Sequence, residues 1–313
     1  MNFNGKNVLV TGGAGFIGSH LVDALVKANA NVQVIDTLKS GCIENLDHSI
    51  DHIQFFEVDI RDYESIVRST KHQDLIFHLA ANASVPNSVS DYSYDFETNV
   101  VGTYNILRAA IKNGVSKVIY TSSAAVYGKP NYVPTKESHP LNPISPYGAT
   151  TASGETIGFV YGETFGLDFS SIRIYNNYGP RQVRFVMYDL LEKLRNDPTR
   201  LIVLGDGRQV RDYCYVSDAV RAFLLIASTS QSRGHAYNLA GGDPITIRDL
   251  AYKIIDLLNL SDIQVEYSGE SWKGDIQTLC ADITKIRKLG FEPQVNLQDG
   301  LTHLVEWFEK SKS

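Results

Sequence analysis

An apolar run, a glycine-rich turn and an amphipathic segment open the chain, in the stretch VLVTGGAGFIGSHLVDAL. The pattern predicts a strand over residues 7–12 and a helix over about 16–27. Gly12, Gly15 and Gly18 fall at the tight turn, at the close approach of backbone to a pyrophosphate, and at the helix–strand contact. The start of the helix would offer free N–H groups and a positive dipole end to phosphates. A glycine-rich turn between a strand and a helix therefore indicates dinucleotide binding, in preference to a glycine turn that binds no ligand.

Acidic residues close the next two strands at the same edge. Asp36 ends the strand over 31–36, 18 residues after Gly18. A carboxylate there can accept a hydrogen bond from a ribose 2′-OH and repels a 2′-phosphate, so NAD is favoured over NADP. Asp59 and Ile60 end the third strand, where the adenine should lie, although Asp59 taken alone would be an ordinary turn acid.

Strand-like runs alternate with helical stretches through the first half of the chain. After the third strand, apolar runs over 75–81, 115–123 and 168–176 read as strands, and 97–114 reads as a helix. This alternation implies right-handed βαβ units and a mostly parallel sheet that is covered on both faces. The fold class is therefore α/β, with a doubly wound parallel sheet of the Rossmann type.

The pattern loosens in the second half, where helical stretches mix with short strands. Helices are expected over about 183–195, 247–258 and 297–309. We expect an NAD-binding domain over 1–178 and a smaller α/β substrate domain over 179–313, parts of which return to pack on the first.

Composition excludes several classes of protein. The chain has 313 residues, a formal net charge of −6 and no run of Lys or Arg longer than a pair, which argues against nucleic-acid binding and a polybasic membrane anchor. No apolar stretch is long enough to cross a membrane, and the amino terminus has no signal-peptide pattern. Cys42, Cys214 and Cys280 lie far apart without metal-ligand spacing, which predicts no disulfide framework, no metal site and a cytoplasmic location.

Ordered motifs cover nearly the whole chain. They are TGGAGFIG (11–18), HLAA (78–81), YTSSAAVYG (120–128), SPYGAT (145–150), RIYNNYGPRQ (173–182), GDGRQVRDYCYVSD (205–218) and ADITKIRKLGFEP (281–293). In this order they resemble the extended short-chain dehydrogenase/reductase family, specifically its nucleotide-sugar epimerases and dehydratases. The series is very specific for the family and much less specific for the sugar.

The resemblance implies roles for individual residues. Ser123 matches the family's catalytic Ser or Thr, and Tyr147 matches the base that takes the proton of the sugar's 4-hydroxyl while the C4 hydride goes to the nicotinamide. Gly12, Gly15, Gly18, Asp36, Asp59 and Ile60 are already expected to contact NAD. The resemblance implies further NAD contacts at Phe16, Ile17, Leu79, Ala80, Ala81, Asn99, Tyr147 and Thr151.

The two residues after Ser123 separate the chemistries within the family. Members that resemble 4,6-dehydratases carry an Asp–Glu pair here, since eliminating water needs an acid and a base, and decarboxylating members often carry a Glu. This chain has Ala124 and Ala125, which supply neither. The resemblance therefore implies a 4-epimerase.

The resemblance also implies substrate contacts in the second half. Asn176 and Arg211 match residues that contact the diphosphate, for which an Arg fork is well suited, and Asp275 belongs to the same site. Where many members carry an Arg, this chain has Trp272 followed by Lys273. Leu279 is intermediate in size at a position that selects sugars, so UDP-glucose/galactose and their N-acetyl forms both stay open.

Thr151 stands where the family has a catalytic lysine, four residues after Tyr147. A lysine there binds the nicotinamide ribose and lowers the tyrosine pKa. Ionising a free Tyr at pH 7 costs about 4 kcal/mol, and a neutral Thr cannot supply it. We expect slow turnover that rises with pH. Three explanations are open: an engineered exchange, a natural enzyme with altered chemistry, or a pseudoenzyme that binds NAD or a nucleotide sugar.

Two helices resemble those that form a dimer interface in this family. They span about 98–113 and 147–165, and their apolar stripes would either pair across a homodimer or pack within one subunit. A homodimer is the expectation.

Overall fold

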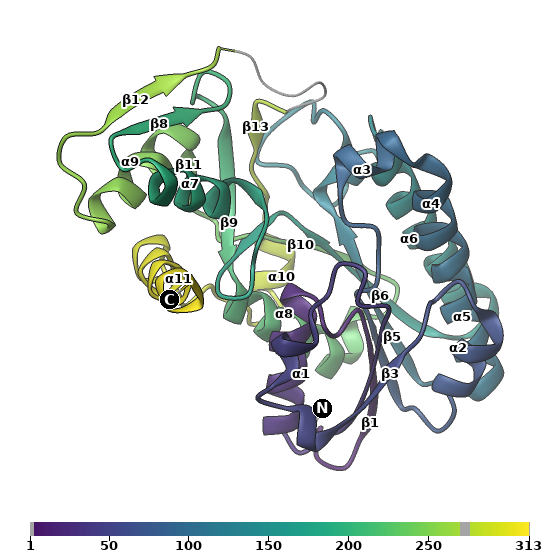
Figure 1. Ribbon diagram of the computed structural model, residues 1–313. Helices are drawn as coiled ribbons and strands as arrows, with labels where there is room; N and C mark the ends of the chain where they lie inside the picture. Colours follow the sequence, from purple (N-terminus) through teal and green to yellow (C-terminus); the bar gives the residue numbers. More distant parts are fainter. Residues whose placement is uncertain (1–2, 270–275, 313) are drawn as a thin grey trace.

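Seven parallel strands form the central sheet of the computed structural model, which describes residues 3–269 and 276–312 (Figure 1). Their order is β10-β6-β5-β4-β1-β2-β3. The strands are β1 (Asn7–Thr11), β2 (Asn31–Asp36), β3 (Ile53–Glu57), β4 (Leu75–His78), β5 (Lys117–Ser123), β6 (Asp168–Ile174) and β10 (Ala236–Leu239). Because β1 lies between β2 and β4, the winding reverses there, and the carboxyl ends of these strands border a crevice of the kind that binds dinucleotides.

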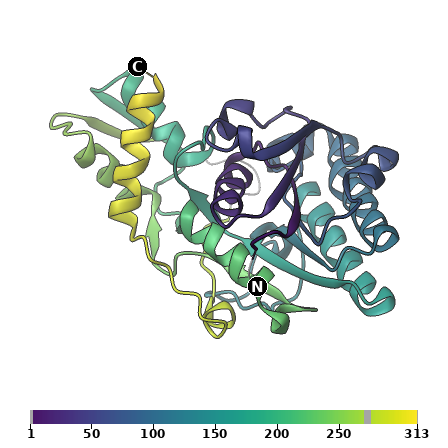
Figure 2. The same cartoon turned by 90° about the horizontal axis from the view of Figure 1, so that it is seen from below.

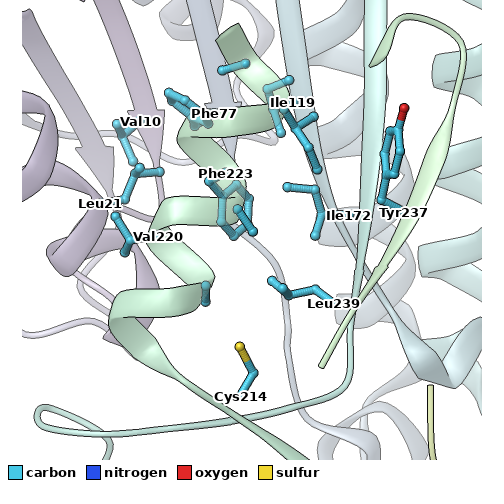
Figure 3. Close-up of a cluster of buried hydrophobic side chains, with 14 of the residues drawn as sticks. Val10, Leu21, Phe77, Ile119, Ile172, Cys214, Val220, Phe223, Tyr237 and Leu239 are labelled. Atoms are coloured by element: carbon cyan, nitrogen blue, oxygen red, sulfur yellow. The ribbon is translucent and has the colours of Figure 1, made fainter. Parts of the chain in front are cut away.

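Helices cover both faces of this sheet. On one face, α1 (Phe16–Lys27) and α8 (Val216–Ser228) share a buried cluster with the strands, in which Leu21, Phe77 and Phe223 lie close together (Figure 3). On the other face are α2 (Tyr63–Ser69), α5 (Thr103–Asn113) and α6 (Pro146–Phe165), which cover a second cluster.

Short helical segments fill the connections. They are η1 (Ile43–Leu46), η2 (Ile50–His52), α3 (Val85–Ser90), α4 (Tyr92–Phe96), the π-helical η3 (Glu97–Gly102), η4 (Ala124–Tyr127) and η5 (Ser230–Ser232).

A smaller lobe follows β6. Its strands are β7 (Asn176–Tyr178), β8 (Arg200–Val203), β9 (Val210–Tyr215), β11 (Pro244–Thr246), β12 (Gln264–Tyr267) and β13 (Thr278–Leu279), and its helices are α7 (Phe185–Asn196), α9 (Ile247–Leu257) and α11 (Leu297–Lys312). The short helix α10 (Thr284–Arg287) instead packs on β10 of the first sheet, and its Ile286 belongs to the cluster shared with α1 and α8. Strand β9 is central: it pairs with β7, β11 and β13, while β8 pairs with β12. Figure 2 shows α11 on the opposite side of the molecule from α2 and α5.

The predicted fold class is confirmed, and the element boundaries need correction. The single helix predicted over 97–114 is divided into the π-helical η3 and α5, and the strand predicted over 168–176 ends at Ile174. Both α8 and β10 lie beyond residue 179 yet pack on the first sheet, in line with the expected return of some segments. The division at 178/179 stays a prediction. In the described part of the chain no helix is long and apolar enough to span a membrane.

Candidate active site

The glycine-rich turn lies beside the loop that follows β4. Gly12 has φ +70°, and a Cβ added to it would lie 2.7 Å from the backbone nitrogen of Ala80. A Cβ on Gly18 would collide with the carbonyl oxygen of Gly12. Gly15 is the N-cap of α1 and provides no side-chain cap, so the first N–H groups of the helix stay uncovered. This arrangement requires glycine at positions 12 and 18, and its backbone donors suit a pyrophosphate.

Asp36 closes β2 next to this turn. Its Oδ2 accepts a hydrogen bond from the Ala14 N–H (3.0 Å) and its Oδ1 accepts one from the Leu38 N–H (2.9 Å). Burial raises the pKa of the Asp36 carboxyl, while the N–H donors act in the opposite direction. A carboxylate has about four acceptor sites and these backbone donors do not fill them all, so Asp36 can also accept from a ribose hydroxyl.

Asp59 and Ile60 follow the neighbouring strand β3, which ends at Glu57 and therefore slightly earlier than predicted. Arg61 binds the Asp59 carboxylate, with its Nη2 2.7 Å from Oδ2. Burial acts to raise the Asp59 pKa, but the hydrogen bonds from Arg61 prevail and hold it below its usual range. Ile60 is buried, and its backbone carbonyl accepts from Asn105 Nδ2 (3.1 Å).

The loop after β4 is fixed to β1. Leu79 donates its N–H to the Thr11 carbonyl (3.1 Å), and Ala80 donates to Thr11 Oγ1 (3.1 Å). The same hydroxyl bonds His78 Nδ1 at 2.7 Å, and burial lowers the pKa of His78 to about 3, so this imidazole is neutral. Leu79, Ala80 and Ala81 are thereby held beside the glycine turn.

Asn99 takes part in a buried network within the fold. Its Oδ1 accepts from the Asn82 N–H (2.8 Å), and its Nδ2 donates to Asp95 Oδ1 and Thr150 Oγ1 (both 3.2 Å). Thr150 donates to Asp95 Oδ2 at 2.7 Å. These bonds join the β4 loop, α4, η3 and α6. The Asn99 side chain therefore holds the site's scaffold, and any NAD contact of its own stays a prediction.

Ser123, Tyr147 and Thr151 come together at the end of β5 and the start of α6. Ser145 caps α6 by accepting from the Gly148 N–H (3.1 Å), which fixes the turn that carries Tyr147. Burial raises the pKa of the Tyr147 phenol, whereas hydrogen bonding to the side chains of Ser123 and Thr151 acts in the opposite direction. The geometry thus joins the two residues predicted to perform catalysis.

The charge around Tyr147 is unfavourable to a phenolate. The Asp95 carboxylate raises the pKa of Tyr147 further, and among the described residues no Lys or Arg acts on it. Thr151 is only 3% exposed, and its backbone carbonyl accepts a hydrogen bond from the Tyr120 hydroxyl (3.1 Å).

The two alanines after Ser123 lie at the start of η4. Ala124 is buried, and the Ala125 N–H donates to Ser123 Oγ (3.2 Å). This bond orients the Ser123 hydroxyl, but neither methyl group can donate or accept a proton.

The predicted substrate residues gather on the small sheet around β9. Arg211 of β9 is in register with Leu279 of β13, and Asn176 begins β7, which pairs with the same strand. The Arg211 Nη1 donates to the carbonyl of Ile276 (2.9 Å). The Nδ2 of Asn176 is buried without a hydrogen-bond partner, so it can donate to a ligand. Asp275, with Trp272 and Lys273, lies outside the described residues.

Sequence reasoning missed a junction between the two lobes. His20 on α1 bonds the Pro180 carbonyl through Nε2 (2.9 Å), and Asp23 forms an ion pair with Arg181 (2.8 Å). Burial lowers the pKa of His20 to about 4, so the ring is neutral. The motif GPRQ marked this loop, but nothing in the spacing indicated its partners on α1.

Known proteins match this chain along nearly its whole length. Residues 9–304 match the family model of GDP-mannose 4,6 dehydratase. The UDP-glucose 4-epimerase of Mycolicibacterium smegmatis is 39% identical over 96% of this chain and 97% of its own length.

Solved structures of both enzyme types have the same fold. The UDP-glucose 4-epimerase of Thermotoga maritima, solved with UDP-glucose, is 38% identical, has a TM-score of 0.92, and the match covers 98% of this chain and 100% of that one. The dTDP-glucose 4,6-dehydratase of Streptomyces venezuelae, solved with NAD, is 34% identical over 98% of both chains, with a TM-score of 0.90. This chain belongs to the extended short-chain dehydrogenase/reductase family of NAD-dependent nucleotide-sugar epimerases and dehydratases.

Proposed function

We propose that the protein epimerises a UDP-hexose at C4, with NAD as cofactor and at a rate limited by Thr151. The observation that carries the proposal is the meeting of Tyr147 with Ser123 at the same carboxyl edge of the sheet as the glycine turn, next to two alanines that provide neither acid nor base.

The residues at the carboxyl edge of the sheet fit NAD. The turn around Gly12 has no room for a side chain, the N–H groups at the start of α1 can meet the pyrophosphate, and Asp36 can accept from the adenosine ribose. When bound, NAD would take up and return the C4 hydrogen with its electron pair.

The chain's own residues move the proton. The Tyr147 phenolate accepts the proton of the 4-hydroxyl, while the Ser123 hydroxyl holds the sugar's 4-oxygen. After the sugar turns its other face to the cofactor, Tyr147 gives the proton back. Because burial and Asp95 raise the pKa of Tyr147, the phenolate is scarce at neutral pH, and the positive charge of oxidised NAD is the remaining source of stabilisation.

The small sheet would hold the rest of the substrate. Arg211 and Asn176 are assigned to the diphosphate, Leu279 to the sugar, and Asp275 to substrate binding. A forked guanidinium binds phosphate oxygens in pairs, and the Asn176 amide has a donor to spare.

Dehydration is the second candidate, because relatives of both kinds match this chain equally well in fold. Ala124 and Ala125 argue against it, since removing water between C5 and C6 requires an acid and a base at this place. A pseudoenzyme is a third candidate, argued against by the intact turn, Asp36, Ser123 and Tyr147.

Product analysis separates these candidates. Concentrated protein with NAD is incubated with UDP-galactose, UDP-glucose and both N-acetyl forms, and the products are resolved by chromatography. Appearance of the C4 epimer supports the proposal, whereas a 4-keto-6-deoxy sugar would establish dehydration. Thermal protection by each nucleotide sugar ranks the substrates independently of turnover, because binding stabilises the folded state. Binding of NAD and a UDP-sugar without any product would favour the pseudoenzyme.

A homodimer completes the proposal. On the sheet face covered by α5 and α6, Tyr104, Val160 and Phe165 are exposed, Val160 to 53%. Val160→Glu should convert the dimer to a monomer in sedimentation experiments, and Tyr252→Glu, on the distant helix α9, should not. A monomeric unaltered protein would contradict this part.

A further inference from the structure

The loop after β2, the loop after β3 and helix α4 meet near the carboxyl ends of β2 and β3, and none of them contains Ser123 or Tyr147. Lys39, in the loop after β2, places its Nζ 3.3 Å from the ring centroid of Tyr94 on α4. The guanidinium of Arg61, after β3, lies 5.0 Å from the same centroid. An aromatic face attracts a cation at these distances, most strongly where water is partly excluded. Tyr94 therefore holds two loops of the sheet edge together.

Arg61 is itself firmly held. It binds Asp59 and also Glu97 of η3, with Nη1 3.0 Å from Glu97 Oε2. Lys39 is exposed, and besides its ring contact with Tyr94 its charge acts on the Asp59 carboxylate, whose pKa it helps to lower, but no hydrogen bond from a described residue holds its ammonium there. Of the two cations, Lys39 is the one that can leave the ring at little cost.

The contact between Lys39 and Tyr94 lies close to the expected coenzyme site, because Lys39 follows Asp36 closely in the chain. β2 and β3 are neighbouring strands, and Lys39 follows Asp36 by three residues. The adenosine end of a dinucleotide lies over the ends of such strands. Lys39 and Tyr94 thus connect the loop that follows Asp36 to α4, which follows β4 in the chain.

We propose that Tyr94 and Lys39 form a clasp over the adenosine end of the coenzyme site, which slows the release of NAD and keeps Lys39 away from a 2′-phosphate. This inference rests on the proposed binding of NAD. With the clasp closed, Asp36 repels NADP and the nearby ammonium is occupied by the ring. With Tyr94 removed, Lys39 becomes free to pair with the 2′-phosphate.

Stopped-flow displacement of NAD, together with equilibrium titration of NAD and NADP, tests the clasp. In Tyr94→Leu we expect NAD to dissociate about tenfold faster and the affinity for NADP relative to NAD to rise about tenfold. Tyr92→Leu is the matched control, because Tyr92 lies on the same helix, 69% exposed, and should change neither quantity.

Lys39→Met separates the two effects and, being at an exposed site, does not endanger folding. It should release NAD as fast as Tyr94→Leu but gain no affinity for NADP, and the double variant should match Lys39→Met. Unchanged release in both single variants would overturn the clasp while leaving NAD binding intact. Failure of the unaltered protein to bind NAD would instead contradict the proposed function, and the clasp with it.

Discussion

Two stretches of helix α6 differ in whether a buried ionisable side chain has a partner of opposite charge. Near its start, Tyr147 and Thr151 have a carboxylate neighbour and, in the described structure, no cation that acts on the phenol. One turn beyond Thr151, Glu155 is 1% exposed and forms an ion pair with Arg173, whose Nε lies 3.1 Å from Oε2. Ser171 donates a further hydrogen bond to Glu155 at 2.8 Å.

The difference shows which part of the helix depends on charge for its structure. Glu155 and Arg173 fasten α6 to β6, and each needs the other because both are buried. Thr151 is held by the hydrogen bond to its backbone carbonyl, by packing and by one neutral hydrogen bond from its side chain to Tyr147, and none of these requires a charge at this position. A neutral residue at 151 therefore leaves the scaffold intact and weakens only the chemistry.

Breaking the ion pair should have the largest effect on stability. Glu155→Ala leaves Arg173 buried without its carboxylate and should lower the free energy of unfolding by about 3–5 kcal/mol. Thr151→Val is the matched control on the same helix and should cost about 1 kcal/mol or less. Urea unfolding of both variants measures the contrast, and equal losses would refute it.

Removing the phenol hydroxyl should have the largest effect on turnover. Tyr147→Phe should reduce kcat at least about hundredfold, because the general base is lost. Tyr120→Phe removes the hydroxyl that bonds the Thr151 carbonyl and should reduce kcat much less. Progress curves with the preferred UDP-sugar compare the two, and similar losses would show that Tyr147 is not the base.

A change of pH should alter the turnover rate less than the loss of the Tyr147 hydroxyl does. The base acts when ionised, and its pKa is raised above 10 chiefly by burial, so its active fraction grows as pH rises. Between pH 7 and 8 the rate should increase about tenfold. A rate that stays level up to pH 9 would contradict the assignment of an unassisted phenol.

Much of the coenzyme edge could be predicted from sequence, because its parts are local. The spacing of Gly12, Gly15 and Gly18 after an apolar strand dictates a turn, and the ends of parallel strands then bring Asp36 and Asp59 to the same edge. The sequence predicts the pairing of Ser123 with Tyr147 only through the family resemblance, and not through their spacing.

The remainder depends on contacts between distant segments, which no local pattern encodes. The return of α8 and β10 to the first sheet, the π-helical turn at η3, and the network of Asp95 with Thr150 all arise from tertiary packing. The sequence predicts plain helix at η3, because a single π-helical turn inside a helix is too short to change the apolar pattern of the segment.

Thr151→Lys tests most directly whether this chain is an epimerase that is slowed by one missing charge. Interconversion of the preferred UDP-sugar at pH 7 by this variant should exceed that of the unaltered protein at least about tenfold, with a weaker dependence on pH, because the ammonium stabilises the Tyr147 phenolate. If the variant folds and binds NAD and UDP-sugar but epimerises none of the four UDP-sugars faster than the unaltered protein, the account is wrong.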